Sequence, residues 1–82
     1  SWLLDARLSI ADFTDILGIK SLPADEKGMY ETLAGFMIKR FGKLPTVADK
    51  FEWDGYIFEV VDMDGKRVDE VLVTPIKSGE EG

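Results

Sequence analysis

The sequence predicts an α+β domain in which two helices pack on one face of a small, mainly antiparallel sheet, in the order β-α-α-β-β-β. Two observations carry this prediction. The second half of the chain holds two Asp-Gly pairs flanked by β-branched and aromatic residues, a strong short-range signal for β-hairpins. The first half holds two segments with apolar residues at helical spacing, each preceded by Ser or Thr and followed by Gly.

The N-terminal quarter of the chain predicts a strand and a short helix. The strand is expected over residues 2–8, where apolar residues alternate weakly with polar ones before a polar turn. Ser9 is the expected N-cap of the helix, and Gly18 suits a left-handed stop. Residues 20–28 lack periodicity and are expected to form a loop. The apolar face of the helix is formed by Ile10, Phe13, Ile16 and Leu17.

A second helix is expected from Thr32, its N-cap, to Phe41, and Gly42 ends it. Gly35 lies inside this helix, where glycine costs about 1 kcal/mol relative to alanine. We therefore expect another backbone or an aromatic ring to pack closely against Gly35. Pro45 prevents the helix from continuing. The apolar stripe consists of Leu33, Phe36, Met37 and Phe41.

The remaining residues predict a three-stranded meander with turns at Asp54-Gly55 and Asp64-Gly65. If the second turn has those two residues at its centre, Asp62 stands opposite Arg67 and forms a cross-strand ion pair. A three-residue loop with a bulge would shift that register, and the sequence leaves both alternatives open. Residues 77–82 are charged and rich in glycine, so they are expected to form a disordered tail.

The composition excludes several kinds of chemistry. The 82 residues include no Cys and no His, so thiol nucleophiles, Ser-His-Asp triads and Cys- or His-ligated metal sites are absent. We therefore predict that the chain is not an enzyme and has no catalytic residues. Its formal net charge of −6 argues against nucleic acid as a partner, because phosphate binding relies on clustered Lys and Arg. No apolar run approaches the roughly 20 residues of a membrane span, so direct insertion of this domain is not expected.

Two groups of residues are candidate binding sites. Asp62 and Asp64 could hold a divalent cation, since hard cations prefer carboxylate oxygens, although hairpin chemistry alone explains the Asp64-Gly65 pair. Trp2, Trp53 and Tyr56 could form an aromatic patch for a partner, although packing in the core or on the sheet is the usual role of aromatic residues in so small a domain. The chain opens on Ser1 with no initiator Met or leader, which predicts that it is a segment of a longer protein.

Several motifs in order resemble the CorC/HlyC transporter-associated domain. They are Trp2-Leu3-Leu4-Asp5-Ala6-Arg7-Leu8, Tyr30-Glu31-Thr32-Leu33-Ala34-Gly35, Phe41-Gly42-Lys43-Leu44-Pro45, and the closing hairpin from Phe58 to Asp69. The resemblance covers roughly residues 2 to 75, and we assign the domain to residues 1–76. One departure is Ala48 before Asp49, where the family usually has Gly, so the turn there is expected to differ locally.

The resemblance implies a regulatory or interaction domain that follows a pair of CBS domains and modulates ion transport. Such domains occur in magnesium and cobalt efflux proteins and in hemolysin-like membrane proteins. The implied partners are the CBS domains and membrane segment of the parent protein, in a homodimer, at the cytoplasmic face of the membrane or in the cytoplasm. No cofactor is expected. The alternative, a flavin (FAD) or adenine-nucleotide-binding domain, rests on fold analogy alone, and the sequence contains no phosphate-binding glycine loop.

Overall fold

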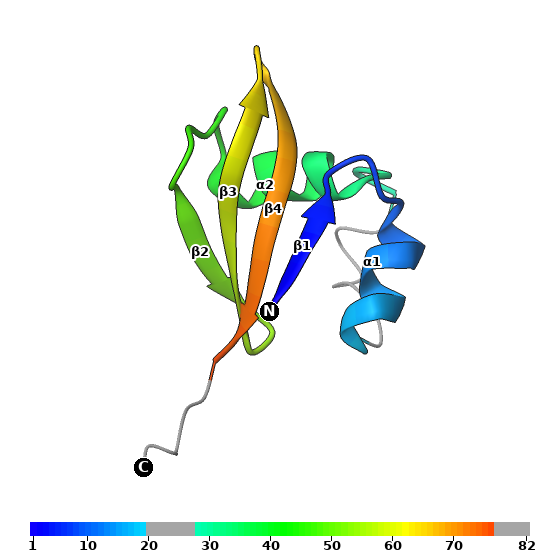
Figure 1. Ribbon diagram of the computed structural model, residues 1–82. Helices are drawn as coiled ribbons and strands as arrows, with labels where there is room; N and C mark the ends of the chain where they lie inside the picture. Colours follow the sequence, from blue (N-terminus) through cyan, green and yellow to red (C-terminus); the bar gives the residue numbers. More distant parts are fainter. Residues whose placement is uncertain (20–27, 77–82) are drawn as a thin grey trace.

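The computed structural model describes residues 1–19 and 28–76. All but the last residue of the loop predicted over 20–28, and the whole tail predicted over 77–82, lie outside the described residues. The elements follow the predicted order (Figure 1). They are β1 (Trp2–Asp5), α1 (Ile10–Leu17), α2 (Leu33–Phe41), β2 (Lys50–Trp53), β3 (Tyr56–Asp64) and β4 (Arg67–Pro75). The first strand ends at Asp5, earlier than the sequence predicted, because residues 5–8 form a turn closed by the Leu8 N–H donating to the Asp5 carbonyl at 3.1 Å.

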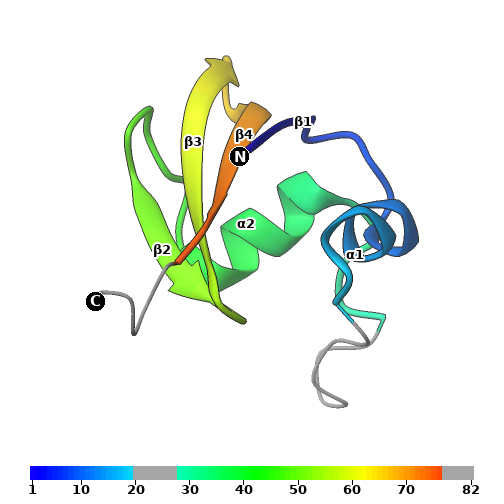
Figure 2. The same cartoon turned by 60° about the horizontal axis from the view of Figure 1, so that its bottom comes forward.

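The four strands form one antiparallel sheet in the order β1-β4-β3-β2. β4 therefore lies between β3, its neighbour along the chain, and β1, which comes from the opposite end of the chain. Both helices lie on the same side of the sheet, with α2 across its face and α1 beyond β1 (Figure 2). The predicted α+β class and the two-helix arrangement are confirmed, and the opposite face of the sheet carries no described helix.

The helix ends form as the sequence predicted. The Ser9 hydroxyl accepts from the Asp12 N–H at 3.1 Å, and Gly18 adopts a left-handed φ of 72°. The N–H of Ile19 then reaches the Thr14 carbonyl at 2.9 Å, and Ile19 is buried. This arrangement is a Schellman motif, in which a buried residue after the glycine secures the helix end.

The start of α2 is tied to the segment that links β1 to α1. The N–H groups of Leu33 and Ala34 donate to the carbonyls of Leu8 and Ala6, at 2.9 and 2.8 Å. These first-turn N–H groups have no partner within their own helix, so the linker supplies their acceptors. These bonds, with the Ile10 N–H donating to the Glu31 carbonyl at 3.0 Å, hold the start of α2 against the start of α1.

The core consists of apolar side chains from the helices and from the helix-facing side of the sheet, centred on three fully buried phenylalanines, Phe13, Phe36 and Phe58. The Phe36 ring lies 5.2 Å from Phe13 and 5.5 Å from Phe58, centroid to centroid. One member of the predicted apolar face departs from this pattern. Ile16 remains 43% exposed, because only the Phe13 and Leu17 side of α1 faces the core.

Gly35 has the close neighbour that the sequence predicted. A Cβ at position 35 would lie 2.9 Å from the Cβ of Tyr30. That atom is attached directly to the backbone, so it cannot move aside without moving the chain. The preceding loop therefore requires glycine inside α2, in spite of glycine's low helix propensity.

The two hairpins differ in how well they match the prediction. Asp54 and Gly55 both have positive φ, 52° and 82°, and Trp53 pairs with Tyr56, as in a type I′ turn. In the second hairpin Asp64 is instead the last residue of its strand and pairs with Arg67. Of the two alternatives that the sequence left open, the pairing of Asp62 with Arg67 is therefore excluded. The turn is centred on Gly65 and Lys66, one residue later than the Asp-Gly rule indicated. Register shifts lie on either side of Asp62 and cancel each other, so the later turn sets the pairing along the whole hairpin.

The departure at Ala48 has a structural consequence. Ala48 has a φ of 82° and is the third residue of a turn that the Asp49 N–H closes by donating to the Thr46 carbonyl at 3.1 Å. This position of a type II turn favours glycine. The Asp49 carboxylate helps to hold the turn by accepting from the Thr46 N–H at 2.9 Å.

Candidate functional site

Acidic side chains gather where β1, β4 and β3 lie side by side. Asp5 pairs with Glu70, and Glu70 pairs in turn with Asp62, so three carboxylates stand in one row across three strands. Alternation with the buried residues Leu4 and Val71 places Asp5 and Glu70 on the face opposite the helices. Like charges directly opposite one another destabilise a sheet, so this row costs the isolated domain some stability.

Asp69 joins this acidic row. Its pKa is raised above the usual value, first by desolvation, then by a side-chain hydrogen bond with Asp62 and by the charges of Asp62, Asp64 and Asp5. A hydrogen bond between two carboxyl groups requires a proton on one of them. Asp69 therefore keeps its proton to a higher pH than an isolated aspartate does. We call Asp5, Asp62, Asp69 and Glu70 the acidic row.

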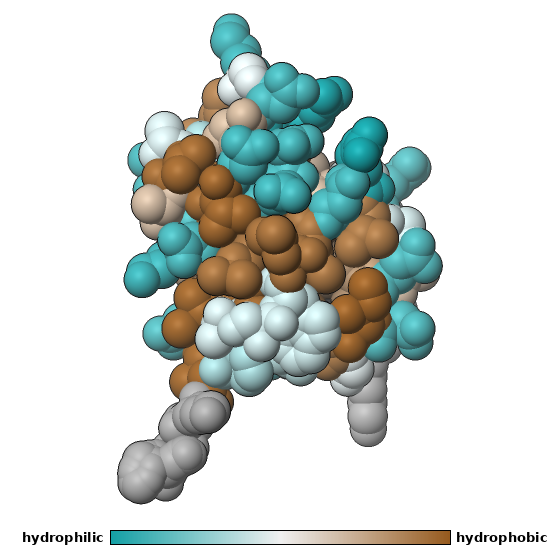
Figure 3. Space-filling view, viewed as in Figure 1, coloured by the Kyte–Doolittle hydropathy of each residue, from teal (hydrophilic) through white to brown (hydrophobic). Residues whose placement is uncertain are grey.

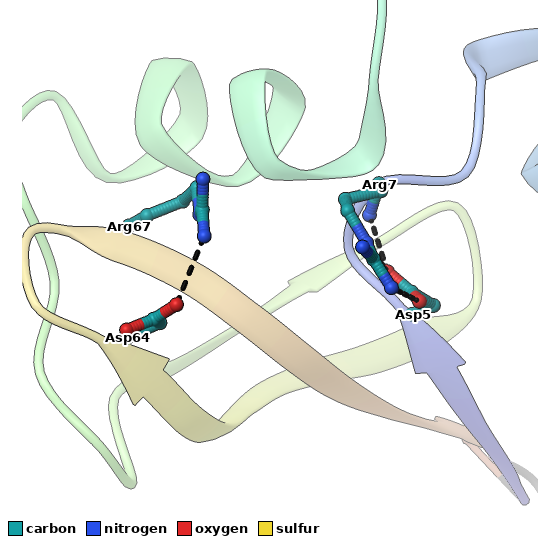
Figure 4. Close-up of polar contacts among 4 residues, drawn as sticks. All are labelled: Asp5, Arg7, Asp64 and Arg67. Atoms are coloured by element: carbon teal, nitrogen blue, oxygen red, sulfur yellow. Dashed lines mark hydrogen bonds and ion pairs between the residues drawn. The ribbon is translucent and has the colours of Figure 1, made fainter.

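Two arginines neutralise carboxylates in this region, one in the acidic row (Asp5) and one beyond it (Asp64) (Figure 4). The Arg7 guanidinium donates to both carboxylate oxygens of Asp5, at 3.1 and 2.8 Å, and lowers the pKa of Asp5 to about 2. At the hairpin tip, Arg67 donates to Asp64 at 2.9 Å. Neither arginine makes an ion pair with Asp62, Asp69 or Glu70 in the described part of the chain.

The two residues predicted to bind a metal are differently placed. Asp64 is engaged by Arg67, whereas Asp62 lies against Asp69. Among residues 1–19 and 28–76, no group of three acidic side chains is arranged closely enough to hold a metal ion. Any cation bound here would therefore be held by one or two carboxylates, with water as the remaining ligands. Sequence reasoning missed Asp5, Asp69 and Glu70, because their proximity depends on the long-range pairing of β1 with β4 and on the bulged register.

The three predicted interface aromatics lie together on the helix-facing side of the sheet. Trp53 pairs with Tyr56 across the first hairpin, and the Tyr56 ring lies 5.9 Å from the Trp2 ring. All three side chains are partly buried against the core. The Tyr56 hydroxyl donates to the Leu17 carbonyl at 2.6 Å and so joins β3 to the end of α1. Their packing gives these residues a structural role, and a role in partner binding stays a prediction.

The opposite face of the sheet exposes a group of aliphatic side chains. They alternate along the strands with the buried residues and so point away from the helices. Leu3 is 60% exposed and the others are half-buried. An apolar area lies across the middle of this face in Figure 3. We call these residues the aliphatic patch, which consists of Leu3, Ile57, Val61 and Leu72.

The chain matches the family of the transporter-associated domain named CorC_HlyC over residues 1–77. The chain belongs to the CorC/HlyC transporter-associated domain family. Over 95% of its length this transporter-associated domain is 44% identical to a polyamine export protein of Escherichia coli K12. Over 89% of its length it is 34% identical to the magnesium and cobalt efflux protein CorC of Salmonella typhimurium LT2. The domain spans only 17% and 24% of the lengths of these two relatives.

Solved structures of transporter-associated domains share the fold. A CorC_HlyC domain from Haemophilus ducreyi superposes with a TM-score of 0.81 at 35% identity, covering 94% of this chain and 89% of that one. The corresponding domain of a Xylella fastidiosa Temecula1 hemolysin, in complex with Mg²⁺ and Mn²⁺, superposes with a TM-score of 0.78 at 36% identity, covering 90% of this chain and 85% of that one. The flavin and nucleotide alternative gains no support from these relatives.

The two helices of the domain are short. Within the described ranges, neither is long and apolar enough to cross a membrane. The family is one of transporter-associated domains and is not known as a catalytic one.

Proposed function

We propose that this domain is a non-catalytic regulatory and interaction module of a magnesium and cobalt efflux or hemolysin-like protein. It modulates transport through contacts with the CBS domains or the membrane segment of the same protein, at the cytoplasmic face of the membrane. The supporting observation is a family match along residues 1–77 in a chain that spans only 17% of a polyamine export protein and 24% of CorC. In this proposal the assembled protein is a homodimer and nucleic acid is not a partner.

The test compares the full-length protein with a version from which this domain is deleted. Efflux of Mg²⁺, Co²⁺ and polyamines is measured from cells that produce equal amounts of the two proteins. The purified domain is also titrated calorimetrically with the CBS-domain pair of the same protein. We expect altered transport on deletion and measurable binding to the CBS pair. Unchanged transport together with no binding would overturn the proposal.

A second candidate function is weak binding of divalent cations by Asp62 and Asp64. It is supported by the Mg²⁺ and Mn²⁺ complex of the Xylella relative and by the carboxylates crowded beside Asp62. Cations that bind only the folded state raise the melting temperature. We expect Mn²⁺ to raise it in the wild-type domain, and less in Asp62→Asn or Asp64→Asn.

The matched control for cation binding is Asp15→Asn, which changes an exposed carboxylate on α1, away from the acidic row. This control should keep the full response to Mn²⁺. An equal response in all three variants would show that the cation acts through general screening, and the site would then be rejected.

A further inference from the structure

The aliphatic patch is continuous across three strands. Leu72, on the central strand β4, pairs with Leu3 on one side and with Glu59 on the other. Ile57 and Val61 are two residues before and after Glu59, so both are diagonal neighbours of Leu72, within reach of its side chain. The solvent face of a half-buried antiparallel sheet normally alternates with polar residues, and four neighbouring aliphatic residues depart from that pattern.

Negative charge surrounds the aliphatic patch on the same face. The acidic row lies at one end, and Glu59 lies on β3 between Ile57 and Val61, opposite Leu72. On β2 the outward residues are Lys50 and Glu52, because Phe51 and Trp53 pack on the core. Alternation places two cationic residues outward on the four strands of the described sheet. Lys50 pairs with Glu59, and Arg67, at the far hairpin tip, is already engaged in an ion pair with Asp64.

Both features are unfavourable in the free domain, since aliphatic side chains meet water and carboxylates stand opposite one another. One kind of partner relieves both costs. An aliphatic surface would cover the patch, and cationic groups on its flanks would meet the carboxylates. A second copy of this chain relieves only the first cost, because it carries a net charge of −6 and the same acidic rim.

We propose that the open face of the sheet docks a protein surface that has an aliphatic ridge flanked by Lys and Arg side chains. This inference rests on the proposed function, for which it supplies the contact surface. The aliphatic patch provides the area removed from water, and the surrounding carboxylates select a basic partner over an acidic one.

The first experiment uses two synthetic amphipathic helices that share one leucine face. One peptide carries lysine on both flanks and the other carries glutamate. Each is titrated into the ¹⁵N-labelled domain, and binding is followed by amide chemical shifts. We expect the lysine peptide to shift the amides around residues 3, 57, 61 and 72 and to bind at least about tenfold more tightly than the glutamate peptide. The difference should shrink at high salt.

Three variants separate the patch from the rest of the surface. Leu3→Ser and Leu72→Ser remove aliphatic side chains from the patch, whereas Ile16→Ser removes one that is 43% exposed on α1. We expect about tenfold weaker binding of the lysine peptide in the two patch variants and no change in the α1 variant. Leu3, at 60% exposed, is the safer of the two for folding.

Charge is tested separately by Glu59→Lys, with Glu31→Lys as its control. Glu31 is exposed beside the start of α2, on the helix side of the molecule. Glu59→Lys should weaken binding of the lysine peptide and strengthen that of the glutamate peptide, whereas Glu31→Lys should change neither markedly.

Three results would overturn the docking surface. The first is a set of shifts centred on the helices, and the second is equal affinity for the two peptides. The third is a dimer of the free domain, seen by sedimentation, that Leu3→Ser abolishes, since the face would then bind a second copy.

The CBS titration distinguishes this inference from the proposed function. If the CBS pair binds and Leu3→Ser and Leu72→Ser leave its affinity unchanged, the docking surface is wrong and the regulatory function stands. If deletion of the domain leaves transport unchanged and the CBS pair does not bind, while the lysine peptide binds as expected, the regulatory function is wrong and the docking surface stands.

Discussion

Ala48 adopts a backbone conformation that is unfavourable for a residue with a Cβ atom. Its φ of 82° is one that residues with a Cβ adopt at a cost of roughly 1–2 kcal/mol. Glycine at this position avoids that cost, but it lowers the free energy of unfolding by about 0.5–1 kcal/mol because it gives the unfolded chain more conformational freedom. We expect Ala48→Gly to raise the free energy of unfolding by about 0.5–1 kcal/mol, measured by urea denaturation. The control is Val47→Gly, at a neighbouring position without positive φ, which should not stabilise the domain.

Asp69 gives the stability of the domain a particular pH dependence. Because its folded-state pKa lies above the unfolded-state value, the folded chain binds more protons between the two pKa values, and stability falls as pH rises through that window. Asp69→Asn removes this effect. We expect the variant to melt at a higher temperature than wild type at pH 7, with the difference disappearing below the unfolded-state pKa.

Asp5 should show the opposite sign, which makes it the control for Asp69. Its pKa of about 2 lies below the usual 3.8, so its contribution is present above pH 3.8 and is lost as the pH falls toward 2. Asp5→Asn should therefore lower the melting temperature at pH 7. Variants that both shift the melting temperature in the same direction at pH 7 would contradict the two assignments.

At the scale of elements, one hydrogen bond joins the sheet to the end of α1. The Tyr56 hydroxyl donates to the Leu17 carbonyl at 2.6 Å, and this carbonyl belongs to the last turn of a helix only eight residues long. Tyr56→Phe keeps the ring contact with Trp2 but leaves that acceptor without its partner. We expect a loss of about 1 kcal/mol in stability. Amide hydrogen exchange should be faster at the end of α1 and unchanged in α2, and equal effects on both helices would contradict this coupling.

At the scale of the whole molecule, Phe36 connects the two layers. It is fully buried, and its ring contacts aromatic rings from α1, β2, β3 and the loop before α2. Phe36→Ala should cost about 3–5 kcal/mol. An 82-residue domain is expected to have a total stability of roughly 4–12 kcal/mol, so the substitution should remove at least about a quarter of the free energy of unfolding.

The control for Phe36 is Phe41→Ala. Phe41 is at the end of the same helix but is only partly buried, and its ring contacts Phe51 at 5.1 Å. Chemical denaturation should show a smaller loss of stability for this variant. Equal losses for the two variants would contradict the central role assigned to Phe36.

The open face of the sheet is assembled from residues that are distant in the sequence, so it is a property of the whole molecule. Leu3 and Leu72 are far apart in the sequence and meet because β1 adds to the edge of the meander. The acidic row forms for the same reason. The docking surface that we propose is therefore a property of the assembled sheet, and no single hairpin contains it.

The sequence by itself determined the element order, both helices with their caps, the type I′ hairpin and the requirement for glycine at position 35. These features depend on contacts within a few residues, or on periodicity along one element, and such information is local. Only the tertiary structure decided the register of the second hairpin, the exposure of Ile16 and the meeting of Asp5 with Glu70 and Asp62. These depend on how distant segments pack. A shift of one residue in a strand moves every side chain to the other face, and the burial of the whole sheet selects among such alternatives.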